Sequence, residues 1–267
     1  MLSSGLVCLL FALSEASRWG WGSAQEIGLL AVAAVILIAW ARYELRVREP
    51  LVDMRMMRRR PVLTTNLAAL LIGFGMFGSF IIIPQLVQLP RSTGFGFGAS
   101  VTEAGLFLLP STAVMLFAGP VAGVLGSRLG SKVPLIAGTL FCAVSFAFLA
   151  AEHEHRWAIY CASAFMGLGI GFAFASMANL IVEAVDRRET GVATGMNTIM
   201  RTIGGSLGGQ ISATILAGHV VHGEPTSTAF TIAFSVSAVA VLIAFCMALA
   251  IPGRAPAPAP EPVFANR

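Results

Sequence analysis

The chain has 267 residues, of which 57% are hydrophobic and only 11% are charged. Soluble globular domains carry about 25% charged residues, so this composition excludes a protein that faces water on all sides. The formal net charge of +4 raises the question of nucleic-acid binding. Because the basic residues gather in loops on one side of the predicted membrane spans, as shown below, we interpret the charge as a membrane-orientation signal and expect no nucleic-acid partner.

Long apolar runs predict an all-α integral membrane protein with about eight transmembrane helices. A helix needs about 20 apolar residues to cross a bilayer. The runs are too long and too uniformly apolar for β-barrel strands, which alternate over about ten residues. The predicted helices cover residues 2–17, 25–43, 62–89, 103–126, 132–151, 157–182, 191–218 and 228–251.

The first helix is short for a span, and no basic residue precedes its apolar core as in a secretory signal peptide. We interpret it as a helix without its first turns, in a chain that begins partway through a longer protein. Residues 1–43 then form a pair of linker helices, and the arginine-rich loop 44–61 separates them from a six-helix bundle at 62–251. A lipid-headgroup site is the alternative role for this loop. The Pro- and Ala-rich residues 252–267 are expected to be a disordered tail.

Arginine and lysine indicate the orientation. One side of the predicted membrane, with loops 42–61, 127–132 and 186–190 and the tail after 251, holds thirteen of them. The other side holds only Arg18, Arg91 and Arg156. Cytoplasmic loops are enriched in Lys and Arg, so the richer side and the C-terminus are predicted to be cytoplasmic, in the plasma membrane.

Small residues recur every four positions in the sixth and seventh predicted helices. Glycines at this spacing allow helix backbones to approach closely in lipid. We therefore predict a helix-packing role for Gly167, Gly171, Gly204, Gly205 and Gly208.

Arg201 lies near the middle of the seventh predicted helix, where a charge is costly unless it faces a cavity or a partner. A helical wheel places it on the same face as Asn197 and the glycines, opposite an apolar arc. We predict that it lines a substrate pathway, together with Asn197, Asn179 and Gln85. A purely structural arginine, bonded to helix ends or carbonyls, is the alternative.

Enzyme, cofactor and metal motifs are missing. The stretch GGSLGG lacks the Lys of a phosphate loop, and no nucleophile, metal cluster or acid pair is expected at depth. The pairs His153/His155 and His219/His222 have no convincing third metal ligand. The four cysteines, Cys8, Cys142, Cys161 and Cys246, are interpreted as packing residues. We expect no cofactor, no metal, no enzymatic activity, and no Asp or Glu near a midplane.

Several segments, in this order and spacing, resemble the C-terminal part of major facilitator superfamily transporters, specifically the drug:proton antiporters with fourteen spans. They are EPLVDMRMMRRR, IPQLVQ, EAGLFLLPSTAVMLFAGPVAGVLGSRLGSK and GLGIGFAFASMANLIVEAVDRRETGVATGMNTIMRTIGGSLGGQI. The resemblance implies that Gly123, Arg128, Gly130 and Lys132 form a cytoplasmic gating loop. The aspartate of that loop signature is replaced by Ser127 here.

The resemblance also implies a function: secondary active, proton-coupled multidrug efflux by alternating access between two bundles. The expected partners are the lipid bilayer, a small amphipathic substrate, protons, and a missing N-terminal half supplied in cis or in trans. The alternative is a non-transporting truncated membrane fragment with at most a structural role. An in-frame upstream sequence encoding six further spans would distinguish the two.

Overall fold

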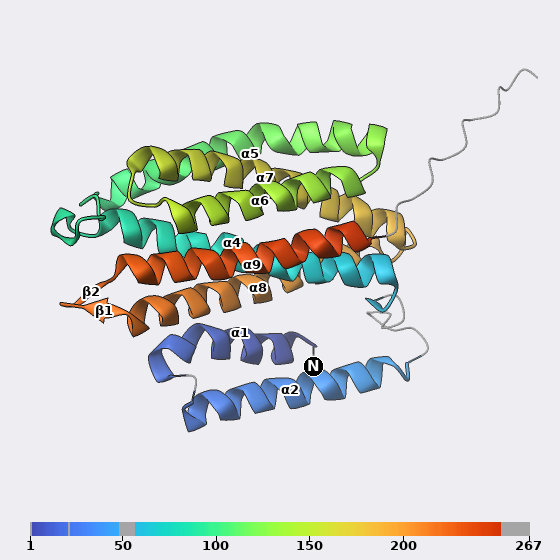
Figure 1. The fold of residues 1–267 in the computed structure, drawn as a ribbon. Helices are drawn as coiled ribbons and strands as arrows, with labels where there is room; N and C mark the ends of the chain where they lie inside the picture. Colours follow the sequence, from blue (N-terminus) through green and yellow to red (C-terminus); the bar gives the residue numbers. More distant parts are fainter. Residues whose placement is uncertain (1, 21, 48–56, 252–267) are drawn as a thin grey trace, which may run out of the picture.

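The computed structural model describes residues 2–20, 22–47 and 57–251, in which eight α-helices run side by side along one axis (Figure 1). They are α1 (Leu2–Trp19), α2 (Ala24–Glu44), α4 (Arg60–Gln88), α5 (Val101–Leu129), α6 (Lys132–Ala151), α7 (Arg156–Ala184), α8 (Thr190–Gly218) and α9 (Ser227–Ala250). Each one lies within a few residues of a predicted span, so the all-α fold class is confirmed. Residues 48–56 of the predicted 44–61 loop, and the whole 252–267 tail, lie outside the described residues.

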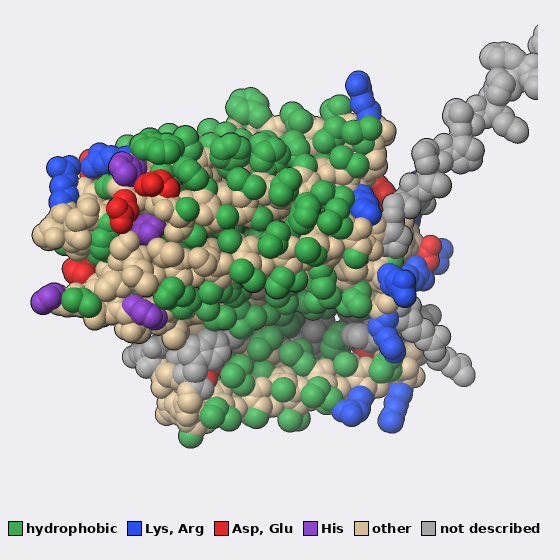
Figure 2. Space-filling model, viewed as in Figure 1, with side chains coloured by type: hydrophobic (Ala, Val, Ile, Leu, Met, Phe, Trp, Pro, Cys, Tyr) green, Lys and Arg blue, Asp and Glu red, His purple; other side chains and the backbone are tan. Residues whose placement is uncertain are grey.

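Six of the described helices are long and apolar enough to cross a membrane: α2, α4, α5, α6, α7 and α9. The other two are less apolar, because α1 is rich in Ser and α8 is rich in Gly and Thr. Hydrophobic side chains cover the length of the bundle in Figure 2, while Lys and Arg gather mainly at the end where α4 begins and α9 ends. On α5, Leu116 and Phe117 are 71% and 70% exposed, as expected for side chains that face lipid.

Local sequence signals begin and end the helices. Ser100 and Glu103 form a capping box at the start of α5, in which the Ser100 backbone N–H donates to Glu103 Oε2 (2.8 Å) and the Glu103 N–H to Ser100 Oγ (3.2 Å). Gly130, at φ 88°, ends α5 and allows the sharp turn into α6.

At the end of the bundle where α4 finishes and α5 begins, two connections contain small elements of their own. The 3-10 helix η1 (Arg91–Thr93) lies between α4 and α5. Between α8 and α9, strands β1 (Val220–Val221) and β2 (Glu224–Pro225) pair antiparallel around His222 and Gly223, which both have positive φ. Two positive φ values are what a tight two-residue hairpin turn requires.

Each helix packs on its neighbours in the order α5, α7, α6, α9, α4, α8, α1, α2. The core towards the β1–β2 end contains buried aromatic side chains, among them Phe107, Phe146 and Phe230. The core towards the opposite end is built from smaller and aliphatic residues such as Ile72, Ala173 and Ala244. The α1–α2 hairpin contacts the rest of the bundle mainly through α1, which lies against α8.

Candidate functional site

The predicted site residues on α8 lie at its contact with α4, the closest helix pair of the bundle. A Cβ atom added at Gly204 or Gly208 would overlap the backbone carbonyl of Leu70 or Phe74. In the other direction, a Cβ at Gly73 of α4 would overlap the carbonyl of Arg201. The two backbones therefore touch, and the glycines leave no room for any larger residue.

Two asparagines join these helices one turn before Arg201. Asn197 Nδ2 donates to Asn66 Oδ1 at 3.0 Å and to the Thr65 carbonyl at 3.4 Å. Both asparagines are buried, at 5% and 2% exposure. In a dry environment such paired amides fix the register of the two helices because each would be costly alone. Asn197 is thus in contact with α4 and is not directed toward an open cavity.

Arg201 lies at the edge of this contact and reaches toward α7. Its side chain is half-buried, and the guanidinium carbon lies 4.1 Å from the centre of the Phe174 ring. This is a cation–π contact, in which the ring face attracts the positive charge. Among the residues that the structure describes, Arg201 forms no ion pair. The arrangement therefore presents a fixed positive charge beside an aromatic face, about 17 Å along α8 from its first residue.

The structure does not bring the other two predicted pathway residues to this place. Gln85 is exposed on α4, twelve residues beyond Gly73 and therefore about 18 Å further along the helix. Asn179 is exposed on α7, five residues beyond Phe174.

The remaining predicted packing glycines also lie at tight contacts. A Cβ at Gly167 would overlap the backbone of Ser111 on α5, and one at Gly171 would lie 2.5 Å from the Ala118 side chain. At Gly205 an added Cβ would lie 2.5 Å from the ring of Phe77 on α4. These positions hold α7 against α5 and α8 against α4.

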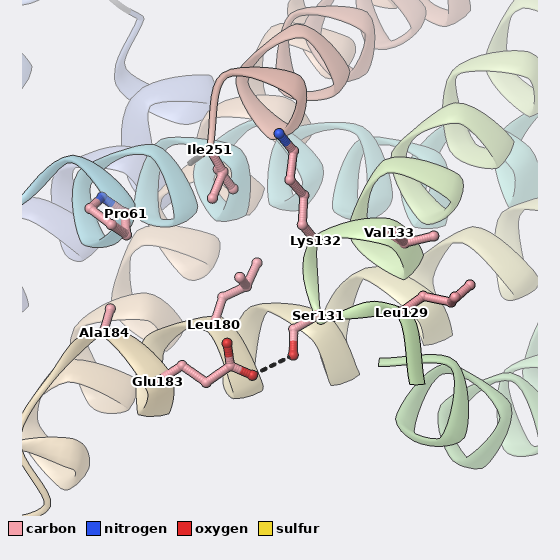
Figure 3. Close-up of a pocket in the computed structure, with 10 residues that line it drawn as sticks. Pro61, Leu129, Ser131, Lys132, Val133, Leu180, Glu183, Ala184 and Ile251 are labelled. Carbon is pink, nitrogen blue, oxygen red and sulfur yellow. Dashed lines mark hydrogen bonds between the residues drawn. The ribbon is translucent and has the colours of Figure 1, made fainter. Parts of the chain in front are cut away.

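The predicted gating loop joins α5 to α6 and bonds the ends of α9 and α7. Lys132 Nζ donates to the Leu249 carbonyl at the end of α9 (2.8 Å), and Ser131 Oγ donates to Glu183 Oε1 near the end of α7 (2.7 Å). Ser131, Lys132 and Glu183 line a cavity of about 530 Å³, whose other wall is apolar (Figure 3). Gly123 is half-buried, and Arg128 is exposed. Ser127, at the aspartate position of the loop, bonds only the Val124 carbonyl of its own helix.

The histidines serve local structure. His153 is buried and lies 3.0 Å from both the Leu149 carbonyl and Ser227 Oγ, beside the Phe95 and Phe234 rings. Burial lowers its pKa from the ordinary value of 6.5, because the charged form is poorly solvated there. Within the described part of the chain, no group of three His, Cys, Asp or Glu residues is placed to hold a metal ion.

Sequence reasoning missed two buried acids on α2. Glu26 and Glu44 are 0% and 5% exposed. Both lie close to the ends of the predicted span, where charged residues are common. For Glu26 the available signal was its spacing: Glu26, Ala33 and Trp40 follow one another at seven-residue intervals on one helix face.

Comparison with solved structures finds a similar helical fold. Two crystal structures of the nucleoside transporter NupG align with TM-scores of 0.60 and 0.56 and are 15% and 16% identical in sequence. They cover 91% and 89% of this chain, which spans 64% of theirs, and this likeness shows the fold alone. The family model of the Major Facilitator Superfamily matches residues 2–209. The chain belongs to this superfamily, as expected, and so to a class of membrane transporters and not of enzymes.

Curated relatives extend the comparison. The tetracenomycin C resistance and export protein of Streptomyces glaucescens is 31% identical over 64% of this chain and 29% of its own length. The multidrug transporter protein MdtP of Bacillus subtilis is 29% identical over 71% of this chain and 35% of its own length. The chain therefore spans about a third of the length of these relatives.

Proposed function

We propose that this chain forms the linker helix pair and the C-terminal bundle of a proton-coupled multidrug exporter that works by alternating access. Support comes from the relatives, whose names describe drug resistance and export, and from superfamily membership. We place the complete protein in the plasma membrane with the C-terminus in the cytoplasm, because basic residues gather at the end where α9 finishes. Its other partners would be a small amphipathic substrate, protons and an N-terminal half.

The observation that carries this proposal is the geometry of Arg201. Its backbone is fixed by the contact with Gly73, while its guanidinium lies on Phe174. Intramembrane arginines usually face a water-filled path or a partner, and this one has five N–H donors beside an aromatic wall. Such a site suits an amphipathic molecule with a hydrogen-bond acceptor and a flat apolar part.

Roles for the other predicted pathway residues follow from their positions. Asn197 acts as a positioning residue, because its side chain is used in the bond with Asn66. Gln85 and Asn179 are exposed at other levels of the bundle, so we propose that they contact substrate before or after it reaches Arg201.

The loop from Gly130 to Lys132 would lock one state. Its hydrogen bonds to Leu249 and Glu183 hold the ends of α9 and α7 together on the proposed cytoplasmic side. Opening the bundle at this end would require these bonds to break. The cavity of Figure 3 lies directly beside them, so the loop has space into which it can move.

An efflux assay tests the proposal. The chain, alone and joined to any in-frame upstream coding sequence, would be expressed in a bacterial host without its own drug exporters. We expect ethidium efflux from the extended protein, with a loss of at least about tenfold for Arg201→Ala, which corresponds to about 1.4 kcal/mol of transition-state stabilisation. Arg201→Lys should retain part of the activity, because it keeps the charge.

The matched control is Thr202→Ala. Thr202 is the next residue on α8, is exposed, and bonds only within its own helix. This variant should transport like the unsubstituted protein. Membrane levels are measured for every variant by immunoblot. Full efflux by Arg201→Ala at an equal membrane level would contradict the proposed role, and absence of efflux from both forms would favour the structural fragment.

A further inference from the structure

The α1–α2 hairpin has a closed internal seam. On α2, the buried side chains Glu26, Ala33 and Trp40 lie at seven-residue intervals, which places them on one face. On α1, Gly5 and Ala12 are buried at the same interval. An added Cβ at Gly5 would lie 2.7 Å from Leu37 Cδ2, so the two helices meet closely along this line.

Glu26 places a carboxyl group in this seam. The residue is 0% exposed, and neither Oε1 nor Oε2 has a hydrogen-bond partner among the residues that the structure describes. The helix N-terminus does not use this carboxyl either, because the Ser23 backbone N–H, which a capping-box glutamate would accept, donates to the Gly20 carbonyl at 3.0 Å. Glu26 is therefore a buried acid that serves neither capping nor a described ion pair.

An ionised carboxylate is very costly in such a place, whereas the protonated acid is far less so. Because Glu26 lies on the third residue of α2, it is close to the turn between α1 and α2. This turn is at the other end of α2 from Arg42 and Arg46. A proton from the solution there has only a short distance to travel to Glu26.

We propose that Glu26 is a proton-binding site, which holds its proton while the α1–α2 seam is closed and releases it only when the helices separate. Proton binding itself rests on the geometry of the hairpin. Its use in energy coupling rests on the proposed function, because the hairpin contacts α8, the helix that carries Arg201. In that role, the proton would be taken up from the outer side, and its release would require α1 to move.

Labelling with dicyclohexylcarbodiimide tests the site without any transport assay. This apolar reagent enters lipid and reacts with protonated carboxyl groups. The full chain, purified and reconstituted in phosphatidylcholine nanodiscs, would be labelled at pH 7 and mapped by mass spectrometry. An ordinary glutamate titrates near pH 4.3, so only about one in 500 is protonated at pH 7. We expect Glu26 to be labelled at least about 100-fold more than the exposed Glu103, which serves as the internal control.

Two variants complete the experiment. Glu26→Gln keeps the size of the side chain and should abolish the adduct in this segment, whereas Glu26→Asp should still be labelled. Helix content by circular dichroism verifies that both variants fold. Labelling of Glu26 no greater than that of Glu103 at pH 7 would overturn the proposal. If Glu26 is labelled but Glu26→Gln leaves efflux unchanged in the extended protein, the proton site stands and its coupling role is wrong.

Discussion

The contact between α4 and α8 yields the most demanding prediction about the fold. Replacing Gly204 and Gly208 together by alanine adds two methyl groups, each of which would overlap a carbonyl of α4, at Leu70 and Phe74. Because both partners are backbone atoms, rotation of a side chain cannot relieve the overlap. The helices must move apart or shift along each other.

The expected magnitude follows from two opposing effects. Overpacking costs about 1–3 kcal/mol at each position. Alanine is the better helix former and returns about 1 kcal/mol at each position. The net loss is therefore about 0–2 kcal/mol per site, or about 2 kcal/mol for the pair at the middle of this range. In a chain of this size, 1 kcal/mol corresponds to a change of about 2–4 °C in melting temperature, so Tm should fall by about 4–8 °C.

The same helix provides a matched control. Cβ atoms added at Gly191 and Gly195 meet nothing within 4 Å. Their replacement by alanine should therefore leave Tm unchanged or raise it, because only the gain in helix propensity remains. Thermal unfolding in detergent, followed by near-ultraviolet circular dichroism, measures both pairs under identical conditions. If the Gly204/Gly208 pair melts above the unsubstituted protein, as the control pair can, the backbone contact between α4 and α8 is wrong.

Three further predictions concern single interactions. A double-mutant cycle of Asn66→Ala and Asn197→Ala, measured by unfolding in mixed micelles, should give a coupling energy of about 0.6–1.7 kcal/mol, and zero coupling would exclude their hydrogen bond. Lys132→Met should speed amide hydrogen exchange in the last turn of α9, because the Leu249 carbonyl loses its charged donor. The control Arg128→Met changes an exposed residue outside that bond and should leave the exchange rate unchanged. Burial lowers the pKa of His153, so the unfolded chain binds a proton at this residue before the folded chain does, and folding stability should fall as pH drops below about 6.5. His153→Gln should reduce this pH dependence in a series of melting temperatures. An unchanged dependence would contradict the assignment.

The fold could be predicted from the sequence because the bilayer leaves few alternatives. A long apolar run must become a helix, so hydropathy gives the positions of the spans directly. The wheel of α8 also places Asn197, Gly204 and Gly208 on one face, and the structure buries this face against α4. Local periodicity is sufficient for such features, because they depend on neighbours in the same helix.

Features that depend on a partner distant in sequence could not be predicted. Asn197 bonds Asn66, which lies 131 positions earlier, and no local pattern identifies that residue. Gln85 was grouped with Arg201 because both are polar in apolar helices, but polarity carries no information about height along the bundle. Glu26 was missed for a related reason, since an acid in the first turn of a helix usually faces water and interacts favourably with the helix dipole.

These contacts indicate where the bundle can change its shape. α8 meets α4 through backbone atoms and a buried amide pair, and a discrete rearrangement there would require both to separate. Its contact with α7 is much smaller and includes the Arg201–Phe174 pair, in which a long side chain lies on a ring. A cation–π contact can be broken and replaced by a ligand at a cost of about 0.5–2 kcal/mol. We therefore expect α4 and α8 to move as one unit, and substrate to act at the boundary between that unit and α7.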